Sequence, residues 1–81
     1  MYPFVPYSYI EKFIPDMIQE GVSEIARSSN GFLNVYKRYG KHLPDAWLKK
    51  RHNFIARTYA AYKLNPTYRR KLSLLAWAFK V

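Results

Sequence analysis

Residues 44–64, PDAWLKKRHNFIARTYAAYKL, contain the pattern that decides the fold. Projected at about 100° per residue, this segment separates into two sides. One side carries the bulky residues Trp47, Leu48, Phe54, Ile55, Thr58, Tyr59 and Tyr62. The other carries small and basic ones, namely Lys49, Lys50, His52, Asn53, Ala56, Arg57, Ala60 and Lys63. This separation predicts one amphipathic helix from about Pro44 to Leu64.

Helical spacing continues on the N-terminal side of this segment. Ser8-Tyr9-Ile10-Glu11 matches a capping box, which predicts a short helix that starts at Tyr9. Pro15 then either opens a second helix or kinks a single longer one. The apolar stripe expected after this point consists of Ile14, Met17, Ile18, Val22 and Ile25, up to a stop at residues 28–31. A further short helix, closed by Gly40, is predicted by Phe32, Leu33, Tyr36 and Tyr39.

The chain has 81 residues, enough for one small core, and we expect a single all-α domain over residues 1–81. Its architecture would be a bundle of four to five helices, ending in a helix-turn-helix-like pair around Asn65-Pro66. Residues 1–7 form an extended N-terminal arm in this prediction, because they include two prolines. Docking on its own domain is the default for such an apolar arm.

The net charge of +9 is unevenly distributed. Residues 8–40 form a neutral helical half, whereas residues 41–81 hold ten cations and one acid, Asp45. Such asymmetry indicates an anionic partner, which can be nucleic acid, an acidic protein surface or anionic lipid. The plain alternative is a charge that only keeps the protein soluble.

Composition excludes several classes of protein. The chain has no cysteine, so disulfides, Cys-ligated metals and thiol catalysis are excluded. No signal peptide is evident and no apolar run reaches the ~20 residues of a transmembrane helix. We therefore expect an intracellular (cytoplasmic) protein or one inside a virion, not a secreted one. His42 and His52 are too far apart to form a metal pair, no phosphate-binding loop is present, and we expect neither an enzyme nor a cofactor.

The basic side of the long helix is the first candidate binding surface. Lys50, Arg57 and Lys63 have no acidic residue at the i±4 positions, and only Lys49 has one, Asp45, which is unusual for a plain solvent face. We expect this side to lie along a phosphate backbone or an acidic protein surface. Membrane-surface binding is less favoured, because the apolar side of the helix is rich enough to form a core.

Arg51 is the exception in this helix, since it projects to the centre of the apolar side. A buried arginine is very costly unless it is paired. The expected role is structural: an ion pair with Glu20 or Glu24, or a snorkelling stem stacked on an aromatic ring. The alternative is a functional arginine in a cleft.

The predicted last helix, from Thr67 to the end, begins with an unusual cluster of charge. Arg69, Arg70 and Lys71 lie in its first turn, where the helix dipole disfavours cations by roughly 0.3–1 kcal/mol each. A bound anion would relieve this repulsion. In a helix-turn-helix arrangement Tyr68, Arg69, Arg70 and Lys71 would face the nucleic acid while the long helix contacted the backbone.

The same helix predicts a second, apolar surface. Leu74 and Trp77 lie opposite the stripe that forms the core contact, so they are either sandwiched within the fold or exposed to a partner. Tyr2 and Phe4 of the N-terminal arm are further candidates for a protein interface. Eight tyrosines in the chain suit a partly wet contact of this kind.

Together these patterns predict a small, non-enzymatic, basic binding protein that engages nucleic acid mainly through phosphates. The alternative is a protein-interaction module: a small structural subunit of a virion or ribonucleoprotein, or a small inhibitor of a host protein. Self-association is a plausible variant of that alternative.

Overall fold

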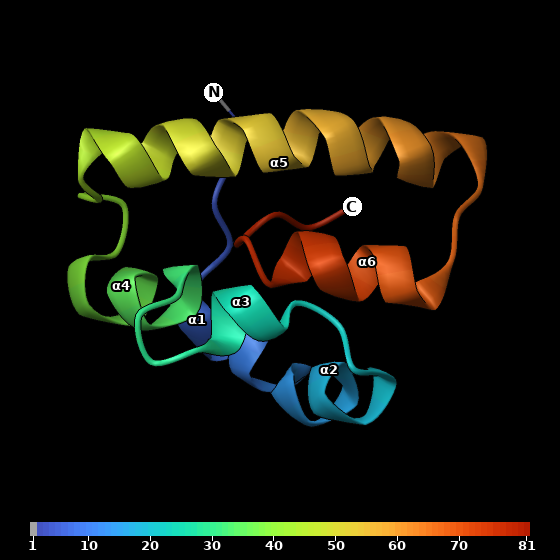
Figure 1. Cartoon of the computed structure of the whole chain (residues 1–81), viewed down its shortest axis with the longest axis horizontal. Coiled ribbons are helices and arrows are strands. Elements are labelled where there is room, and N and C mark those ends of the chain that lie inside the picture. Colours follow the sequence, from blue (N-terminus) through green and yellow to red (C-terminus); the bar gives the residue numbers. More distant parts are fainter. Residues whose placement is uncertain (1) are drawn as a thin grey trace.

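Six helices make up the computed structural model, which describes residues 2–81. They are α1 (Tyr7–Glu11), α2 (Ile14–Glu20), α3 (Glu24–Arg27), α4 (Phe32–Tyr39), α5 (Asp45–Leu64) and α6 (Tyr68–Leu75), as labelled in Figure 1. Four of them have seven or more residues, and the described part of the chain contains no strand. The prediction of an all-α fold is therefore confirmed, but the helix count is wrong: six helices are present where four to five were expected.

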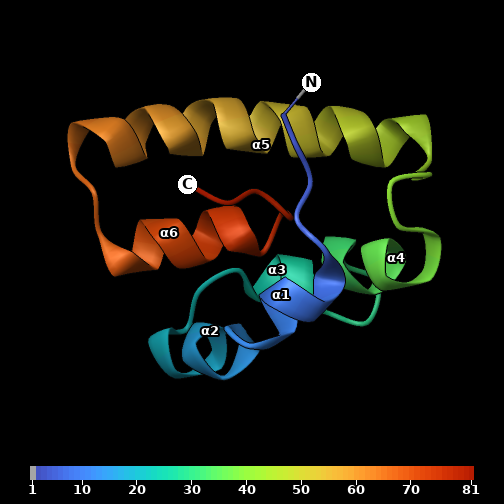
Figure 2. The ribbon, with the colours of Figure 1, turned by 180° about the vertical axis from the view of Figure 1, so that it is seen from behind.

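The long helix α5 spans one side of the molecule (Figure 1). The next helix, α6, runs back beneath it in nearly the opposite direction, as in a helical hairpin. Helices α1–α4 gather at the side of the molecule opposite α5 (Figure 1). Seen from behind, the N-terminal segment crosses α5 near its middle on its way to α1, and the C-terminal segment lies between α5 and α6 (Figure 2).

The start of α1 differs from the prediction. Pro6 is the N-cap, with extended backbone, and no side chain caps the helix. The Pro6 carbonyl accepts from the amides of Tyr9 (3.0 Å) and Ile10 (3.3 Å), so the helix begins before Ser8. Proline suits this position because a helix start has amides without partners and proline lacks one. The capping box at Ser8 is thus wrong, and the extended arm comprises residues 2–6 among those described.

The single helix expected after Pro15 is in fact two, α2 and α3, because α2 ends at Gly21. Gly21 has a left-handed φ of 65°, and its amide donates to Ile18. The next amide, of Val22, donates to the Met17 carbonyl at 3.0 Å, which completes a Schellman motif. The break rotates the chain, so Met17 and Val22 are buried while Ile18 is 59% and Ile25 81% exposed. The prediction of a five-residue apolar stripe is therefore wrong for Ile18 and Ile25, because their side chains face solvent.

The last helix also ends early, at Leu75 rather than at the C-terminus. The amide of Phe79 donates to the Leu74 carbonyl at 3.1 Å and that of Ala78 to Leu75 at 2.9 Å, with Ala78 at a φ of 62°. This is the same Schellman pattern, here with alanine in the left-handed position. It turns residues 76–81 back under α5 and buries Phe79.

Trp77 lies at the centre of the core rather than on the surface. Its ring stacks on Phe32 of α4 (4.8 Å between centroids) and on Phe54 of α5 (5.0 Å). Leu74 is fully buried and Trp77 is 9% exposed. The exposed second apolar strip is therefore a wrong expectation: the turn after Leu75 directs both side chains inward, so Leu74 has no exposed surface and Trp77 keeps only a small exposed edge.

Candidate nucleic-acid interface

The outer face of α5 has the composition that its sequence predicted. Lys49, Lys50, Arg57 and Lys63 are all exposed, as are the intervening alanines Ala56 and Ala60. The buried residues of the helix are Arg51 and Ile55, on the opposite side. A helix of 20 residues is about 30 Å long. We name these four cations and the surface between them the α5 basic face.

No cation of the α5 basic face pairs with an acid among residues 2–81, where Arg69–Glu20 is the one ion pair. Two of them contact aromatic rings of their own helix instead. The Nζ atom of Lys50 lies 4.9 Å from the centroid of Trp47, and that of Lys63 lies 4.8 Å from Tyr59. These contacts direct the stems while leaving the ammonium groups in solvent, where they can meet an anion.

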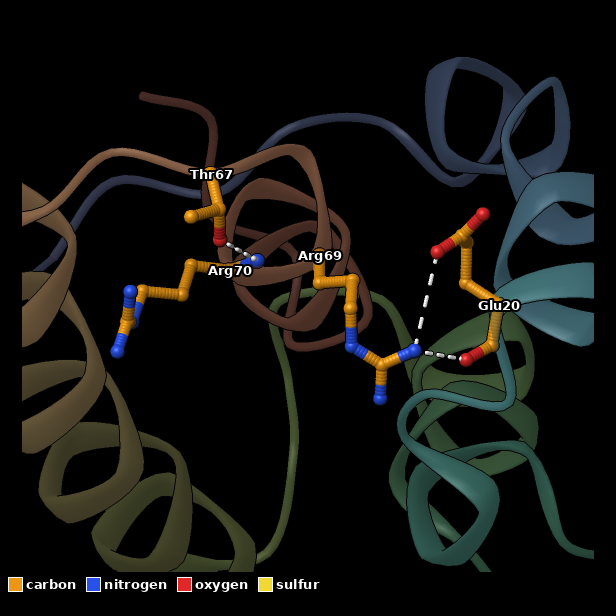
Figure 3. Close-up of polar contacts among 4 residues, drawn as sticks. All are labelled: Glu20, Thr67, Arg69 and Arg70. Atoms are coloured by element: carbon orange, nitrogen blue, oxygen red, sulfur yellow. Dashed lines mark hydrogen bonds and ion pairs between the residues drawn. The ribbon is translucent and has the colours of Figure 1, made fainter.

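Arg69 and Arg70 leave the first turn of α6 in opposite directions (Figure 3). Arg69 donates to the Glu20 backbone carbonyl, and its Nη1 lies 3.7 Å from the Glu20 carboxylate. Arg70 donates from Nη1 to the Asn65 carbonyl at 2.9 Å. Glu20 is the last residue of α2 and Asn65 is the C-cap of α5. Each guanidinium thus lies at the negative end of another helix, which explains why cations are tolerated at the start of α6.

The neighbouring residues are engaged within the fold as well. Thr67 caps α6, because its hydroxyl oxygen accepts from the Arg70 amide at 3.2 Å (Figure 3). The Tyr68 hydroxyl donates to the Asp16 carboxylate, and this hydrogen bond raises the pKa of Tyr68. The Nζ atom of Lys71 lies 5.7 Å from the Phe13 centroid. The cluster from Tyr68 to Lys71 therefore has structural contacts that its sequence did not reveal.

Arg51 is 2% exposed and donates four hydrogen bonds, all to backbone carbonyls. On the C-terminal side the acceptors are Trp77, at 2.7 Å from Nε, and Ala78, at 3.0 Å from Nη2. On the N-terminal side they are Tyr2, at 2.8 Å from Nη1, and Pro3, at 2.7 Å from Nη2. One guanidinium therefore joins both ends of the described chain to α5.

The predicted ion pair of Arg51 with Glu20 or Glu24 is wrong, since Glu20 pairs with Arg69. The aromatic contact is confirmed, because the guanidinium carbon lies 3.8 Å from the centroid of Phe4, but the side chain does not snorkel to solvent, since it is buried. Burial lowers the pKa of Arg51 to about 10, which still leaves it charged at neutral pH. Carbonyl dipoles and a ring face compensate this buried charge in place of a carboxylate.

The N-terminal arm docks on its own domain. Tyr2 packs against Phe79 (5.4 Å between centroids) and His52 (5.2 Å), and Phe4 stacks on Tyr36 (5.6 Å). Both Tyr2 and Phe4 are only partly buried. Their apolar surfaces therefore already have partners inside the fold, and only their exposed remainders can meet another protein.

Two grooves that sequence reasoning missed adjoin α6. The larger, of about 610 Å³, lies between α5, α6 and residues 21–26, and Arg57 and Phe54 are among its lining residues. The smaller, of about 390 Å³, is lined by Val22, Thr67, Arg69, Arg70 and Ser73. Ser73 borders both grooves. They depend on the unexpected break between α2 and α3, so no local sequence signal could have revealed them.

The described residues hold no group of three or more histidine, cysteine or acidic side chains that could bind a metal ion. Among residues 2–81, every helix is too short or too polar to cross a membrane. Comparison with protein-family models, with curated proteins and with solved structures finds no match.

Proposed function

We propose that this chain is a small, non-enzymatic binding protein that engages nucleic acid through phosphate contacts from the α5 basic face. The observation that supports this proposal is that none of these cations forms an ion pair within the described residues, although Asp45 lies one turn before Lys49. Four exposed cations follow one helix whose single acidic residue is Asp45, so the positive charges greatly outnumber the negative ones. Phosphates attract such an array by Coulomb forces and by the release of condensed counterions.

The cluster from Tyr68 to Lys71 has a smaller part in this proposal than the sequence suggested. Arg69 and Arg70 already interact with the ends of α2 and α5. A phosphate that recruited them would have to compete with those contacts. The proposal therefore does not use α6 as a recognition helix and assigns the main phosphate contacts to Lys49, Lys50, Arg57 and Lys63.

The test is the affinity of the protein for labelled DNA and RNA at about 50 and 200 mM salt. The slope of log affinity against log salt concentration reports the number of phosphates contacted. The variant is a triple Lys→Gln change at Lys49, Lys50 and Lys63. Its matched control is a triple Lys→Gln change at Lys12, Lys37 and Lys41, which are exposed on other segments. Both variants lose three positive charges, so they differ only in where the charges were.

We expect the α5 variant to bind more weakly than the control. We also expect its salt slope to be shallower, by about 0.7–0.9 for each phosphate that the variant no longer neutralises. Equal weakening of both variants would show that only the overall charge matters. No binding by the wild-type protein at low salt would contradict the proposal.

A protein-interaction module is the second candidate, and a different observation favours it. Ile18, Ile25 and Leu64 are exposed by 59%, 81% and 88%. Large apolar side chains in this state are typical of contact sites when they form a patch. An assembly subunit or an inhibitor should hold its partner at high salt and lose it when these residues are changed, whereas a phosphate binder should do the reverse.

A further inference from the structure

The larger groove beside α6 opens directly from the α5 basic face. Arg57 belongs to both, since it is exposed on the helix and also lines the groove. Phe54, one turn earlier, lines the same groove and is only partly buried. A strand that follows the basic face therefore meets an aromatic side chain at the point where it reaches Arg57.

The lining of this groove has two different parts. Towards α5 and the core it presents Arg57, Phe54 and Trp77, and the two rings stack on each other at 5.0 Å. Towards residues 21–26 it presents Ser23, Glu24 and the exposed Ile25. Glu24 repels phosphate but can accept a hydrogen bond from the amino or imino group of a base. The groove therefore suits a base, with the phosphates outside it on the arginine side.

The smaller groove continues this path. It begins at Ser73, which the two grooves share, and leads to Arg70 and Arg69. The larger volume, about 610 Å³, lies within the ~300–1,000 Å³ typical of sites for small organic ligands. The two grooves together therefore form a surface with room for a small organic group, and Arg57, Arg69 and Arg70 lie along it.

We infer that the larger groove accommodates an unpaired base, so that the nucleic acid bound by this protein is single-stranded. The backbone of the strand then follows the α5 basic face to Arg57, and the base beside Arg57 enters the groove. Paired bases inside a duplex cannot enter such a groove, whereas unstacked bases commonly pack against aromatic side chains. This inference rests on the proposed function and adds the class of its ligand.

The test compares two isoleucines that are both exposed. Ile25→Asp places a negative charge at the rim of the groove, and Ile18→Asp makes the same change in a different depression, beside Tyr7 and Leu33. The probes are oligothymidylate, oligouridylate and a DNA duplex, each of about 12 nucleotides, a length within the usual range of single-strand sites. Circular dichroism verifies that both variants are folded.

We expect Ile25→Asp to weaken single-strand binding by about five-fold or more relative to Ile18→Asp. We expect the two variants to bind the duplex equally. Single strands that carry 5-bromouracil should crosslink under ultraviolet light to residues 21–26, 54–57 or 73–77. Comparison of the thymidine and uridine strands shows whether the sugar matters.

Equal weakening by the two variants, tighter binding of the duplex, or crosslinks confined to other segments would overturn the inference. If the α5 variant still weakens duplex binding in that case, the proposed function stands without the groove. If no probe binds at low salt, the proposed function itself fails.

Discussion

At the scale of single residues, Arg51 determines how the two ends of the described chain are held. Its guanidinium donates to Tyr2 and Pro3 on one side and to Trp77 and Ala78 on the other. Backbone carbonyls in extended segments and turns lack the regular hydrogen-bond donors of a helix or sheet. Burying such a carbonyl without any donor costs free energy. A fork with five N–H donors satisfies four such groups at once.

Arg51→Met should lower the free energy of unfolding by about 2–4 kcal/mol, because the carbonyls of Trp77, Tyr2 and Pro3 lose their side-chain donor, whereas that of Ala78 keeps the Val5 amide. Lys50→Met, at the neighbouring exposed position, is the control and should change stability little. Arg51→Lys should also destabilise the fold, since one ammonium cannot reach both chain ends. Urea denaturation followed by circular dichroism measures all three. A loss under about 1 kcal/mol for Arg51→Met would show that the carbonyls find water or other donors instead.

Tyr36 provides a prediction about pH. Its hydroxyl donates to the Val5 carbonyl at 2.6 Å, and burial raises its pKa. Between the ordinary tyrosine pKa of about 10 and the raised one, the unfolded chain has lost this proton while the folded chain keeps it. Folding then takes up a proton, so the contribution of Tyr36 is fully present below about pH 10 and is lost as the pH rises through the folded pKa.

The comparison with Tyr36→Phe isolates this contribution, because all other groups titrate in both proteins. At pH 8 the variant should be less stable by about 1 kcal/mol, because the hydrogen bond to Val5 is missing. Above pH 10 this difference should shrink, as the wild-type protein loses stability faster than the variant. A difference that stays constant from pH 8 to 11 would contradict the raised pKa.

At the scale of elements, the long helix could be predicted and the breaks between short helices could not. A segment of 20 residues with one apolar and one basic side predicts a single long helix, and α5 is that helix. The break after α2 depended on Gly21, whose left-handed φ ends the helix although the apolar spacing continues through it. The end of α6 had even less signal, because Ala78 takes the position that usually requires glycine or asparagine.

Gly31 sets how closely α3 and α4 can approach. A Cβ atom at this position would lie 2.6 Å from the Ala26 carbonyl oxygen and closer still to that of Ile25. Gly31→Ala should therefore destabilise the protein by about 1–3 kcal/mol, because backbone atoms must move to make room. Asn30→Ala, the exposed neighbour, should be nearly neutral in the same thermal denaturation. Equal stability of the two variants would mean that the α3–α4 connection shifts without cost.

At the scale of the whole molecule, the candidate site divides into a part that the sequence predicts and a part that it does not. The α5 basic face follows from helical geometry, since exposure and charge are properties of one helix. The hydrogen-bond acceptors of Arg51, Arg69 and Arg70 are backbone carbonyls, which every residue carries and no sequence pattern distinguishes. Those of Arg51 and Arg69 lie 26 to 49 residues away. The grooves beside α6 likewise depend on segments far apart in the chain.

The same long-range contacts predict how the molecule opens. The Val5 amide donates to the Ala78 carbonyl at 3.0 Å, and that oxygen also accepts from Arg51. An amide this near the end of a chain usually exchanges with solvent within seconds, because the end frays locally. Here it can exchange only when the N-terminal arm, the C-terminal turn and α5 separate. We therefore expect the free energy for its exchange to approach that of core amides such as Ile55.

Hydrogen exchange measured by NMR tests this expectation, and Arg51→Met is its control. In that variant the Val5 amide should lose more protection than the Ile55 amide, because the arm loses its connection to α5 while the helix keeps its own hydrogen bonds. Fast exchange of Val5 in the wild-type protein would show that the arm opens separately from the core. Slow exchange of both amides in the wild type, with selective loss at Val5 in the variant, would instead establish that one buried arginine makes the two chain ends part of the cooperative fold.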